Sequence, residues 1–450
     1  MATYTFETMA QSDASNFTAT DFLFFLSGNI ANLGVTDNPG TSSSNALGTT
    51  ITAESITLTS GGKSLTFSAA ELSAASKASP DHILLGNDLL VFGQGGTTSV
   101  PYDDAGTAGT LSLAAGTAGH SAVAFGFAGA DSIVGGSASD TINGGEGNDT
   151  ITGHSSFNAT ESDWLLGGNG ADVITGGNGN DHIYGNVAVG AGGAADGNDV
   201  IVAGDGHDYV NGNAGNDTID GGNGNDRLYG GNGDDSIEGG AGNDYLQGNK
   251  GNDTLQDTGT STTEVNIIHG GAGNDIISAA HGLNQLFGEL GNDSITGGGE
   301  ADKIWGGVGY DTVQGNGGAD TFYFASGDAD IANVTSAYTA TSHGVTDVVS
   351  DFTHGTDKLS LGFSVTAVDT AAGGTTFSTV DDAYTYAKGV LAGHGTDVVA
   401  LYVHDTNTGH TADVGTYVFW DSAHSTGTID SVVHLSSVSD PTTIAKTDFI

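Results

Sequence analysis

The stretch GGNGNDRLYGGNGDDSIEGG, residues 221–240, contains two copies of one nine-residue unit. Each copy has an aspartate at its sixth position and a single aliphatic residue, Leu228 or Ile237, at its eighth. A segment this rich in glycine buries too little apolar surface to offset the conformational entropy that it loses on folding. Something other than hydrophobic burial must therefore hold it in shape.

The same unit, Gly-Gly-x-Gly-x-Asp-x-U-x with U a large aliphatic residue, repeats from residue 126 to residue 324. Its sixth-position aspartates are Asp131, Asp140, Asp149, Asp163, Asp172, Asp181, Asp199, Asp208, Asp217, Asp226, Asp235, Asp244, Asp253, Asp275, Asp293, Asp302, Asp311 and Asp320. A degenerate unit that keeps the nine-residue register precedes Asp199, a longer one precedes Asp275, and Asn284 stands where an aspartate is expected. A fixed short period predicts a solenoid, in which each unit packs only on its neighbours.

The charge balance indicates that a cation supplies the missing stability. The chain carries 54 acidic residues against 8 lysines and arginines, a formal net charge of −46, and stacked units would place aspartates above one another. Calcium suits such a site, because it takes six to eight oxygen ligands from carboxylates and carbonyls. Magnesium resists dehydration, and zinc or copper would need His or Cys ligands that the unit lacks. Glycines, and the position-five asparagines such as Asn225 and Asn243, tolerate the left-handed backbone that the turns need.

The repeat resembles the calcium-binding nonapeptide of the RTX (repeats-in-toxin) family. The resemblance implies an all-β fold, a parallel β-roll in which two nonapeptides form one coil and calcium ions lie in two columns between turns 18 residues apart. It places Asp199, Asp217, Asp235 and Asp253 along one column, and Asp208, Asp226 and Asp244 along the other. It also implies carbonyl ligands from the turn residues Asn216, Asn225, Asn243, Asn252, Gly222, Gly224, Gly231, Gly233, Gly240 and Gly242. Asn284 and the degenerate units depart from the family pattern, so the resemblance does not extend to calcium there.

A flexible linker rich in Gly and Asp is the alternative interpretation of residues 126–324. It is disfavoured, because a linker has no reason to hold an aliphatic residue at every ninth position.

Composition narrows the range of partners. Nucleic acid and anionic membranes are not expected, because binding either requires basic surface. The chain has no cysteine, so disulfides and thiolate metal sites are excluded. No apolar run is long enough for a membrane span, and the first residues show no basic n-region followed by an apolar h-region. We therefore expect calcium ions as the partner, no membrane insertion, and no N-terminal export signal.

Small β-rich domains are predicted on both sides of the repeat. In residues 1–125 the run SITLTSGGKSLTFS (55–68) indicates a hairpin around Gly-Gly, 82–93 and 121–127 indicate further strands, and 69–77 a short helix. In residues 325–450 strand-like runs occur at 347–352, 397–404, 415–421 and 430–436.

The C-terminal region also resembles RTX proteins. The segment DVVSDFTHGTDKLSL (347–361) is similar to the segment that follows the roll in serralysin-type proteases. The last residues, Asp448, Phe449 and Ile450, resemble a signal for the type I secretion machinery. The resemblance implies export from a Gram-negative bacterium and a secreted, extracellular or cell-surface location, where plentiful calcium would fold the chain.

The seventh and ninth positions of each unit should point outward, and alternate units should share a face. One face then presents a stripe of interface candidates: Tyr209, Arg227, Tyr229, Tyr245, Phe287, Trp305 and Tyr323. The stripe is either covered by the chain's own flanking segments or contacts other molecules, as exposed aromatic patches do. The same counting places a smaller apolar patch on the other face: Trp164, Leu166, Tyr184, Val200 and Val202.

No enzyme motif is present. H-E-x-x-H is absent, and GHSAV (119–123) lacks the last glycine of G-x-S-x-G. We therefore expect a non-enzymatic structural or adhesive protein that self-assembles into a homo-oligomer or polymer, as a surface layer, matrix or filament. The alternative is a secreted hydrolase or toxin-like protein with an unrecognised active site in a flanking domain.

Overall fold

The computed structural model describes the backbone of residues 122–153, 161–186, 197–324 and 347–361, and it describes the rest of the chain in part. Before residue 122 it describes short strands alone, and after 361 it describes residues 365, 368–370, 375–378, 380–394, 398–404, 414–420, 429 and 431–450. The chain divides into two compact units, Met1–Ala214 and Gly215–Ile450.

The first unit begins with short strands. They are β1 (Thr3–Thr5), β2 (Phe22–Phe24), β3 (Gly34–Asn38), β4 (Ser42–Asn45), β5 (Gly48–Ile51), β6 (Ser55–Ser60), β7 (Lys63–Ser68), β8 (His82–Leu85), β9 (Asp88–Phe92) and β10 (Thr110–Ser112). The hairpin predicted around Gly-Gly is confirmed, because β6 and β7 pair antiparallel. The short helix predicted at 69–77 lies outside the described residues.

Two parallel ladders of strands follow in the first unit. One contains β10, β12 (Ser132–Val134), β14 (Thr150–Thr152), β16 (Val173–Asn178) and β18 (Val200–Asp205). The other contains β9, β11 (Ala122–Ala128), β13 (Thr141–Glu146), β15 (Trp164–Asn169), β17 (His182–Tyr184) and β19 (Tyr209–Ala214). Successive strands alternate between the ladders, so two nonapeptides form one coil and the predicted parallel β-roll is confirmed.

One prediction about this unit is wrong. The 18 residues from Asp181 to Asp199 form one half-coil with an insertion, not two half-coils, because β17 pairs with β19 and β16 with β18. Trp164 and Tyr184 therefore lie on the same sheet as Tyr209, and Val200 lies on the other sheet. The predicted small apolar patch is thus divided between the two sheets.

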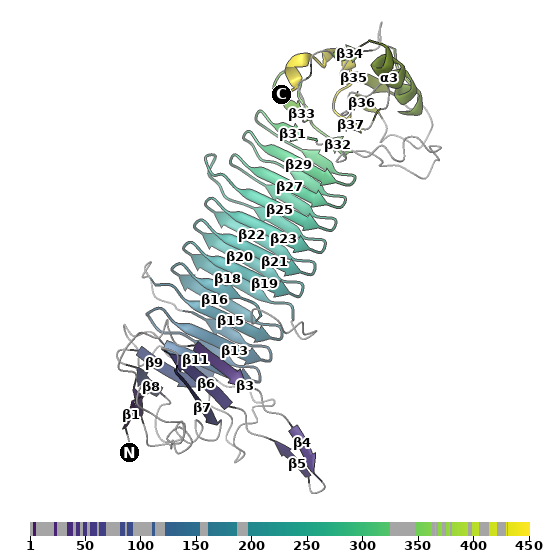
Figure 1. Ribbon diagram of the computed structural model, residues 1–450. Coiled ribbons are helices and arrows are strands. Elements are labelled where there is room, and N and C mark those ends of the chain that lie inside the picture. Colours follow the sequence, from purple (N-terminus) through teal and green to yellow (C-terminus); the bar gives the residue numbers. More distant parts are fainter. Residues whose placement is uncertain are drawn as a thin grey trace. The chain divides into compact units, whose positions relative to one another are not determined.

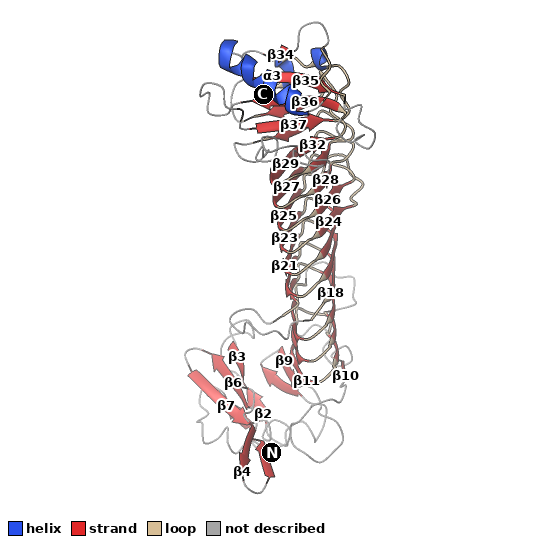
Figure 2. Ribbon diagram, turned by 90° about the vertical axis from the view of Figure 1, so that its right-hand side faces the viewer, coloured by secondary structure: helices blue, strands red, loops and turns tan. Residues whose placement is uncertain are grey.

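The second unit contains a longer stack of the same kind (Figures 1 and 2). One sheet contains β20 (Thr218–Asn223), β22 (Ser236–Ala241), β24 (Thr254–Asp257), β26 (Ile276–Ala279), β28 (Ser294–Thr296), β30 (Thr312–Gln314) and β32 (Asp347–Val349). The facing sheet contains β21 (Arg227–Asn232), β23 (Tyr245–Lys250), β25 (Ile267–Ala272), β27 (Gln285–Leu290), β29 (Lys303–Val308), β31 (Thr321–Tyr323) and β33 (Lys358–Ser360). Coil stacking continues past residue 324, because β32 pairs with β30 and β33 with β31.

The interior of the roll is one aliphatic side chain thick on each sheet. The eighth-position residues, such as Ile219, Leu228, Ile237 and Leu246, are at most 1% exposed. Each strand places this residue inward and its two neighbours outward, because side chains alternate along a strand. The core is therefore continuous along the stack although each unit contributes little to it.

The C-terminal region adds four strands and a helix to this unit. The strands β34 (Val368–Thr370), β35 (Val398–Val403), β36 (Gly415–Trp420) and β37 (Ser431–Leu435) continue the sheet of β32, with β37 beside β32. The short 3-10 helices Pro441–Thr443 and Lys446–Asp448 close the chain. The predicted strand runs are confirmed, but α3 (Val380–His394) was not anticipated. It packs Ala383 and Ala387 against β35 and β36, where the core includes Phe419.

Candidate metal centre

Every repeat aspartate lies immediately before a strand and points into the roll. Asp217, Asp226 and Asp235 precede β20, β21 and β22, and they are 1–2% exposed. The inward aliphatic residue follows two positions later, so the aspartate has the same inward parity as Leu228 or Ile237. The nonapeptide thereby fixes one buried carboxylate to each buried aliphatic residue.

A repeated hydrogen bond links these aspartates into columns. The backbone N–H of Asp217 donates to Oδ1 of Asp235 at 2.8 Å, and the N–H of Asp235 donates to Oδ1 of Asp253 at 2.8 Å. In the second unit the bond links Asp217, Asp235, Asp253, Asp275, Asp293, Asp311 and Asp347 on one side. On the other side it links Asp226, Asp244 and Asn266, and then Asn284, Asp302, Asp320 and Asp357.

The first unit has two columns of the same form. The hydrogen bonds join Asp131, Asp149, Asp172 and Asp199 in one, and Asp140, Asp163, Asp181 and Asp208 in the other. Each of these aspartates is at most 6% exposed.

The second carboxylate oxygen is the chemically unusual atom. Among the described residues, a buried Oδ2 without a hydrogen-bond partner occurs in Asp149, Asp235, Asp244, Asp253, Asp275 and Asp293. Each such oxygen lies beside the first-position glycine of its own unit, so that a Cβ on Gly230 would lie 2.2 Å from Oδ2 of Asp235. Only glycine leaves room for the carboxylate there. A buried charged oxygen without a partner is costly, so the site calls for a cation.

Burial shifts the protonation of these carboxyl groups. It raises the pKa of Asp235 to about 8, of Asp244 and Asp293 to about 7, and of Asp253 and Asp275 to about 6. The hydrogen bond from the preceding aspartate lowers the pKa, and neighbouring acidic groups raise it again. The folded roll therefore holds these groups ionised at neutral pH only at a cost, unless a positive charge lies beside them.

The turns supply backbone oxygens next to the carboxylates. The glycines at positions two and four have positive φ: Gly222 (95°), Gly224 (142°), Gly231 (122°), Gly233 (128°), Gly240 (100°) and Gly242 (144°). The turns stack so closely that a Cβ on Gly242 would lie 1.5 Å from the carbonyl oxygen of Gly224. Among the described residues no three His, Asp or Glu side chains form a ready metal cluster, so a cation here needs these carbonyls as well. An oxygen-only donor set of carboxylates and carbonyls is the set that calcium prefers.

The position-five asparagines have a different role from the predicted one. The described non-glycine residues with positive φ are Asn213, Asn249, Glu289 and Asn316, all at position two. Position two forms the bend that glycine usually occupies, so the expectation of left-handed backbone at position five is wrong. Asn225 instead accepts a hydrogen bond from the N–H of Asn243 at 2.8 Å, and Asn216 accepts one from Asp234 at 3.0 Å. Asn252 does the same for Asn274, so the side chains form ladders along the turns.

Four residues of the columns were missed by sequence reasoning: Asp257, Asn266, Asp347 and Asp357. Asp347 and Asp357 follow a long insertion that hides the repeat period, although each has an aliphatic residue two positions later, Val349 and Leu359. Asn266 occupies the sixth position of the half-coil that stacks on the half-coil of Asp244, and its side chain is fully buried. The inward aliphatic Ile268 two residues later was the signal that could have found it.

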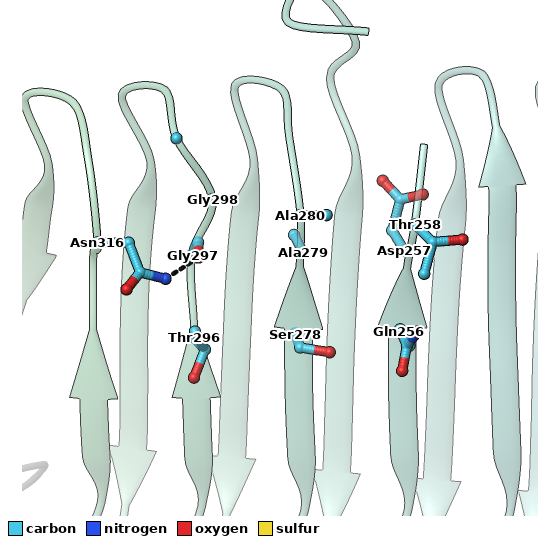
Figure 3. A pocket seen from close by; sticks show the side chains of 11 residues that line it. Gln256, Asp257, Thr258, Ser278, Ala279, Ala280, Thr296, Gly297, Gly298 and Asn316 are labelled. Atoms are coloured by element: carbon cyan, nitrogen blue, oxygen red, sulfur yellow. Dashed lines mark hydrogen bonds between the residues drawn. The ribbon is translucent and has the colours of Figure 1, made fainter. Parts of the chain in front are cut away.

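A pocket lies at the ends of β24, β26 and β28, where the repeat is degenerate (Figure 3). Asp257 and Ala279 are paired in register at the ends of β24 and β26, and Gly297 follows directly after β28. Asn316 donates a 2.7 Å hydrogen bond to the carbonyl of Gly297. The pocket is open to solvent, and most of its lining residues are Gly, Ala, Ser or Thr.

The predicted stripe is a column of stacked rings on the sheet of β21–β31. In the second unit it comprises Tyr229, Tyr245, His269, Phe287, Trp305 and Tyr323, all half-buried. Ring centroids are 4.3 Å apart between Phe287 and Trp305, and 4.1 Å between Trp305 and Tyr323. Arg227 is exposed on the same sheet, and Tyr209 stacks on His182 in the first unit. His269, Phe287, Trp305 and Tyr323 stack face to face, whereas the Tyr229–Tyr245 and Tyr245–His269 pairs are tilted.

Two apolar side chains outside the aromatic stripe of the second unit are more exposed than its rings. Leu290 and Val308 are 55% and 52% exposed and occupy adjacent register positions on β27 and β29. Sequence reasoning missed them, because they occupy the third position of a turn and not a strand face.

The proposed secretion residues belong to the folded C-terminal region. Asp448 is fully buried and accepts three hydrogen bonds, one of them from Nδ1 of His354 at 2.7 Å. Phe449 bridges to Leu359 in β33, and the N–H of Ile450 donates to the carbonyl of Leu359 at 3.1 Å. Ile450 itself is 57% exposed.

Comparison with known proteins identifies the repeat. The family model of the RTX calcium-binding nonapeptide repeat matches residues 125–156, 159–187, 194–228, 220–255, 261–295 and 296–330. No curated protein matches the chain. Among the described residues no helix is long and apolar enough to cross a membrane.

Proposed function

The nonapeptides of this chain match the RTX calcium-binding repeat, and from that premise we propose a secreted calcium-binding structural protein that folds on extracellular calcium and self-assembles at the cell surface. The columns of buried aspartates carry the proposal. Their Oδ2 atoms lie beside first-position glycines and turn carbonyls, and a divalent cation there would neutralise charges that the fold otherwise buries at a cost.

Calcium binding would then be coupled to folding. The chain holds 54 acidic residues, so in the absence of calcium its own charge keeps it extended. Extracellular calcium modules have dissociation constants of about 10⁻⁴–10⁻³ M, well above cytosolic calcium and below extracellular calcium. Folding is therefore expected outside the cell and not inside it.

The C-terminus supports export before folding. In the folded chain Asp448 and Phe449 are 0% and 8% exposed, so a secretion signal made of these residues is accessible only while this region is unfolded. The exported species is then the calcium-free, extended chain.

Two surfaces favour a structural, non-catalytic role by self-assembly. Leu290 and Val308 form an exposed apolar pair, and Trp305 and Tyr323 continue a row of aromatic groups. Exposed apolar groups that are contiguous in space mark interaction surfaces.

The calcium part is tested by circular dichroism and size-exclusion chromatography of the full chain in calcium and in EDTA. We expect a β-sheet spectrum and a compact hydrodynamic radius in calcium, and neither of them in EDTA. Identical spectra and radii in both conditions would contradict calcium-coupled folding.

The assembly part is tested by negative-stain microscopy of the same samples. We expect ordered sheets or fibres in calcium, and their loss when Tyr229, Trp305 and Tyr323 are changed to Ser, or when Leu290 and Val308 are changed to Ser. Persistent monomers in calcium would refute self-assembly and favour the hydrolase hypothesis. Assembly that survives both variants would refute the assigned surfaces.

A further inference from the structure

The half-coil between β24 and β25 departs from the repeat at three positions together. Asp257 stands where other half-coils have their first-position glycine, and Asn266 stands at the sixth position. Glu264 replaces the fourth-position glycine, because its carbonyl contacts Gly282 in the next coil as Gly224 contacts Gly242. Sequence comparison with the repeat alone would predict that this half-coil has lost its cation site.

Asp257 and Asn266 exchange the usual roles of the first and sixth positions. In a regular half-coil the aspartate carboxylate lies beside the first-position glycine, as Asp253 does beside Gly248. Here the first position carries the carboxylate and the sixth carries the amide, and Nδ2 of Asn266 donates a hydrogen bond to Oδ2 of Asp257. Both side chains are at most 1% exposed. This half-coil therefore keeps one buried carboxylate although it has lost the repeat pattern.

Three oxygen atoms converge beside Gly259. A Cβ at this glycine would lie 2.5 Å from Oε2 of Glu264, 2.8 Å from the carbonyl oxygen of Gly240 and 3.2 Å from Oδ1 of Asp257. Oε2 of Glu264 is buried and has no hydrogen-bond partner among the described residues. These distances run to the position of an absent Cβ, which is too close to the Gly259 backbone to hold an ion, so they show that the three oxygens converge on one place and not where an ion would lie. Oδ1 of Asp257 also accepts the N–H of Gly259 at 3.0 Å, which fixes its orientation toward this place. A bound calcium ion would need these oxygens at about 2.3–2.6 Å from the ion itself.

The neighbouring coil adds negative charge close to Asp257. Asp244 is 2% exposed, and its Oδ2 is buried without a hydrogen-bond partner among the described residues. Asp244, Glu264 and Glu238 all lie close enough to Asp257 for their charges to raise its pKa, in addition to the larger effect of burial. Glu238 is engaged otherwise, because Oε1 accepts hydrogen bonds from the N–H and hydroxyl of Thr258.

We propose that the half-coil at residues 257–266 binds a divalent cation of the calcium type through Asp257, Glu264 and the carbonyl of Gly240. The nonapeptide pattern does not encode this site, which rests on the proposed calcium-binding function of the roll. The site carries two carboxylates and a backbone oxygen, a hard donor set that suits calcium over the softer transition metals.

The half-coil that stacks next on the same side, between β26 and β27, shows what a half-coil without a cation site looks like. Ala279 fills the first position, and the amide of Asn284 donates to the carbonyls of His281 and Gly282 at 3.0 and 3.3 Å. Glu300 shares the fourth position with Glu264, but its Oε2 accepts the N–H of Gly282 at 3.1 Å and lies 3.8 Å from Nδ1 of His281. Glu300 is therefore a matched control for Glu264.

Native mass spectrometry of the full chain at increasing calcium concentration counts the bound ions. We expect Glu264→Gln and Asp257→Asn each to bind one ion fewer than the wild type, and Glu300→Gln to bind the same number. Ion counts equal to the wild type in Glu264→Gln and Asp257→Asn would overturn the site. A wild-type chain that binds no calcium would instead refute the proposed function as a whole.

A double variant covers the case in which a single variant fails to fold in calcium. Asp257→Gly with Asn266→Asp restores the usual order of glycine and aspartate. The proposal requires this variant to bind as many ions as the wild type, because it moves the carboxylate without removing the site. One ion more than the wild type would show that the natural half-coil binds none.

Discussion

Replacing Asp235 by Asn should change the stability of the roll in opposite directions with and without calcium. Asp235 is 2% exposed and burial raises its pKa from 3.8 to about 8. At pH 7 only the span from 3.8 to 7 counts, about 3 pKa units, because above the unfolded pKa the fold must bind a proton that the unfolded chain has lost. Holding this group in the fold therefore costs about 4 kcal/mol relative to the unfolded chain, at about 1.4 kcal/mol per pKa unit. Asn removes that cost and leaves a buried amide unpaired, which costs about 1–3 kcal/mol. We expect the calcium-free fold to gain about 2 kcal/mol.

In calcium the same substitution should be harmful. Asp235 supplies a carboxylate to its column, so its loss should raise the calcium concentration at the folding midpoint about tenfold, or about 1.4 kcal/mol. Asp234→Asn is the matched control, because Asp234 is the adjacent residue, is exposed and loses the same formal charge. Its Oδ1 accepts the N–H of Asn252, a role that an Asn carbonyl oxygen can keep.

The assay is far-UV circular dichroism of both variants, followed against pH in EDTA and against calcium at pH 7. Asp235→Asn should unfold at higher pH than the wild type in EDTA and fold at higher calcium, whereas Asp234→Asn should shift little in either titration. The reasoning is refuted if the two variants behave alike, or if Asp235→Asn destabilises the calcium-free fold.

Three further outcomes follow from the same geometry. In EDTA the β-sheet signal should strengthen as the pH falls from 8 to 5. The folded-state pKa values of the buried aspartates are raised, so the calcium-free fold is most stable below the unfolded value of 3.8 and loses stability as pH rises through about 6–8. A signal that weakens on acidification would contradict this. Gly230→Ala should raise the calcium concentration at the folding midpoint steeply, because its Cβ would lie 2.2 Å from Oδ2 of Asp235. Gly299→Ala, where the added Cβ meets open space, should change that midpoint by less than about 0.5 kcal/mol. Equal shifts in the two variants would exclude the steric explanation. Asp448→Ala should destabilise the C-terminal region by about 3–5 kcal/mol, because it removes three hydrogen bonds to a buried carboxylate, including the bond from His354. Hydrogen exchange measured in calcium should then show lost protection of residues 347–361.

Much of the roll was readable from the local pattern. An aspartate two residues before an aliphatic residue, in a nine-residue period, determines one inward carboxylate and one inward core residue per half-coil, since side chains alternate along a strand. The 18-residue coil in the regular stretch follows from the same period, as the pairing of Leu228 with Leu246 shows. Each half-coil packs only on its neighbours, so a short segment contains nearly all the information that its own fold requires.

Where the nine-residue period is interrupted, the spacing of residues no longer predicts which strands become neighbours. There, only the tertiary structure shows the strand pairing. It made the segment from Asp181 to Asp199 one half-coil, which moved Trp164 to the other sheet. It brought Asp257 against Asn266, an exchange of roles that no count of residues reveals because it depends on which side chains face each other across the interior. It also buried Asp448 against the last coil, a contact between residues 94 positions apart. The sequence by itself determined the repeating chemistry, and the tertiary structure determined which carboxylates share a site where the repeat fails.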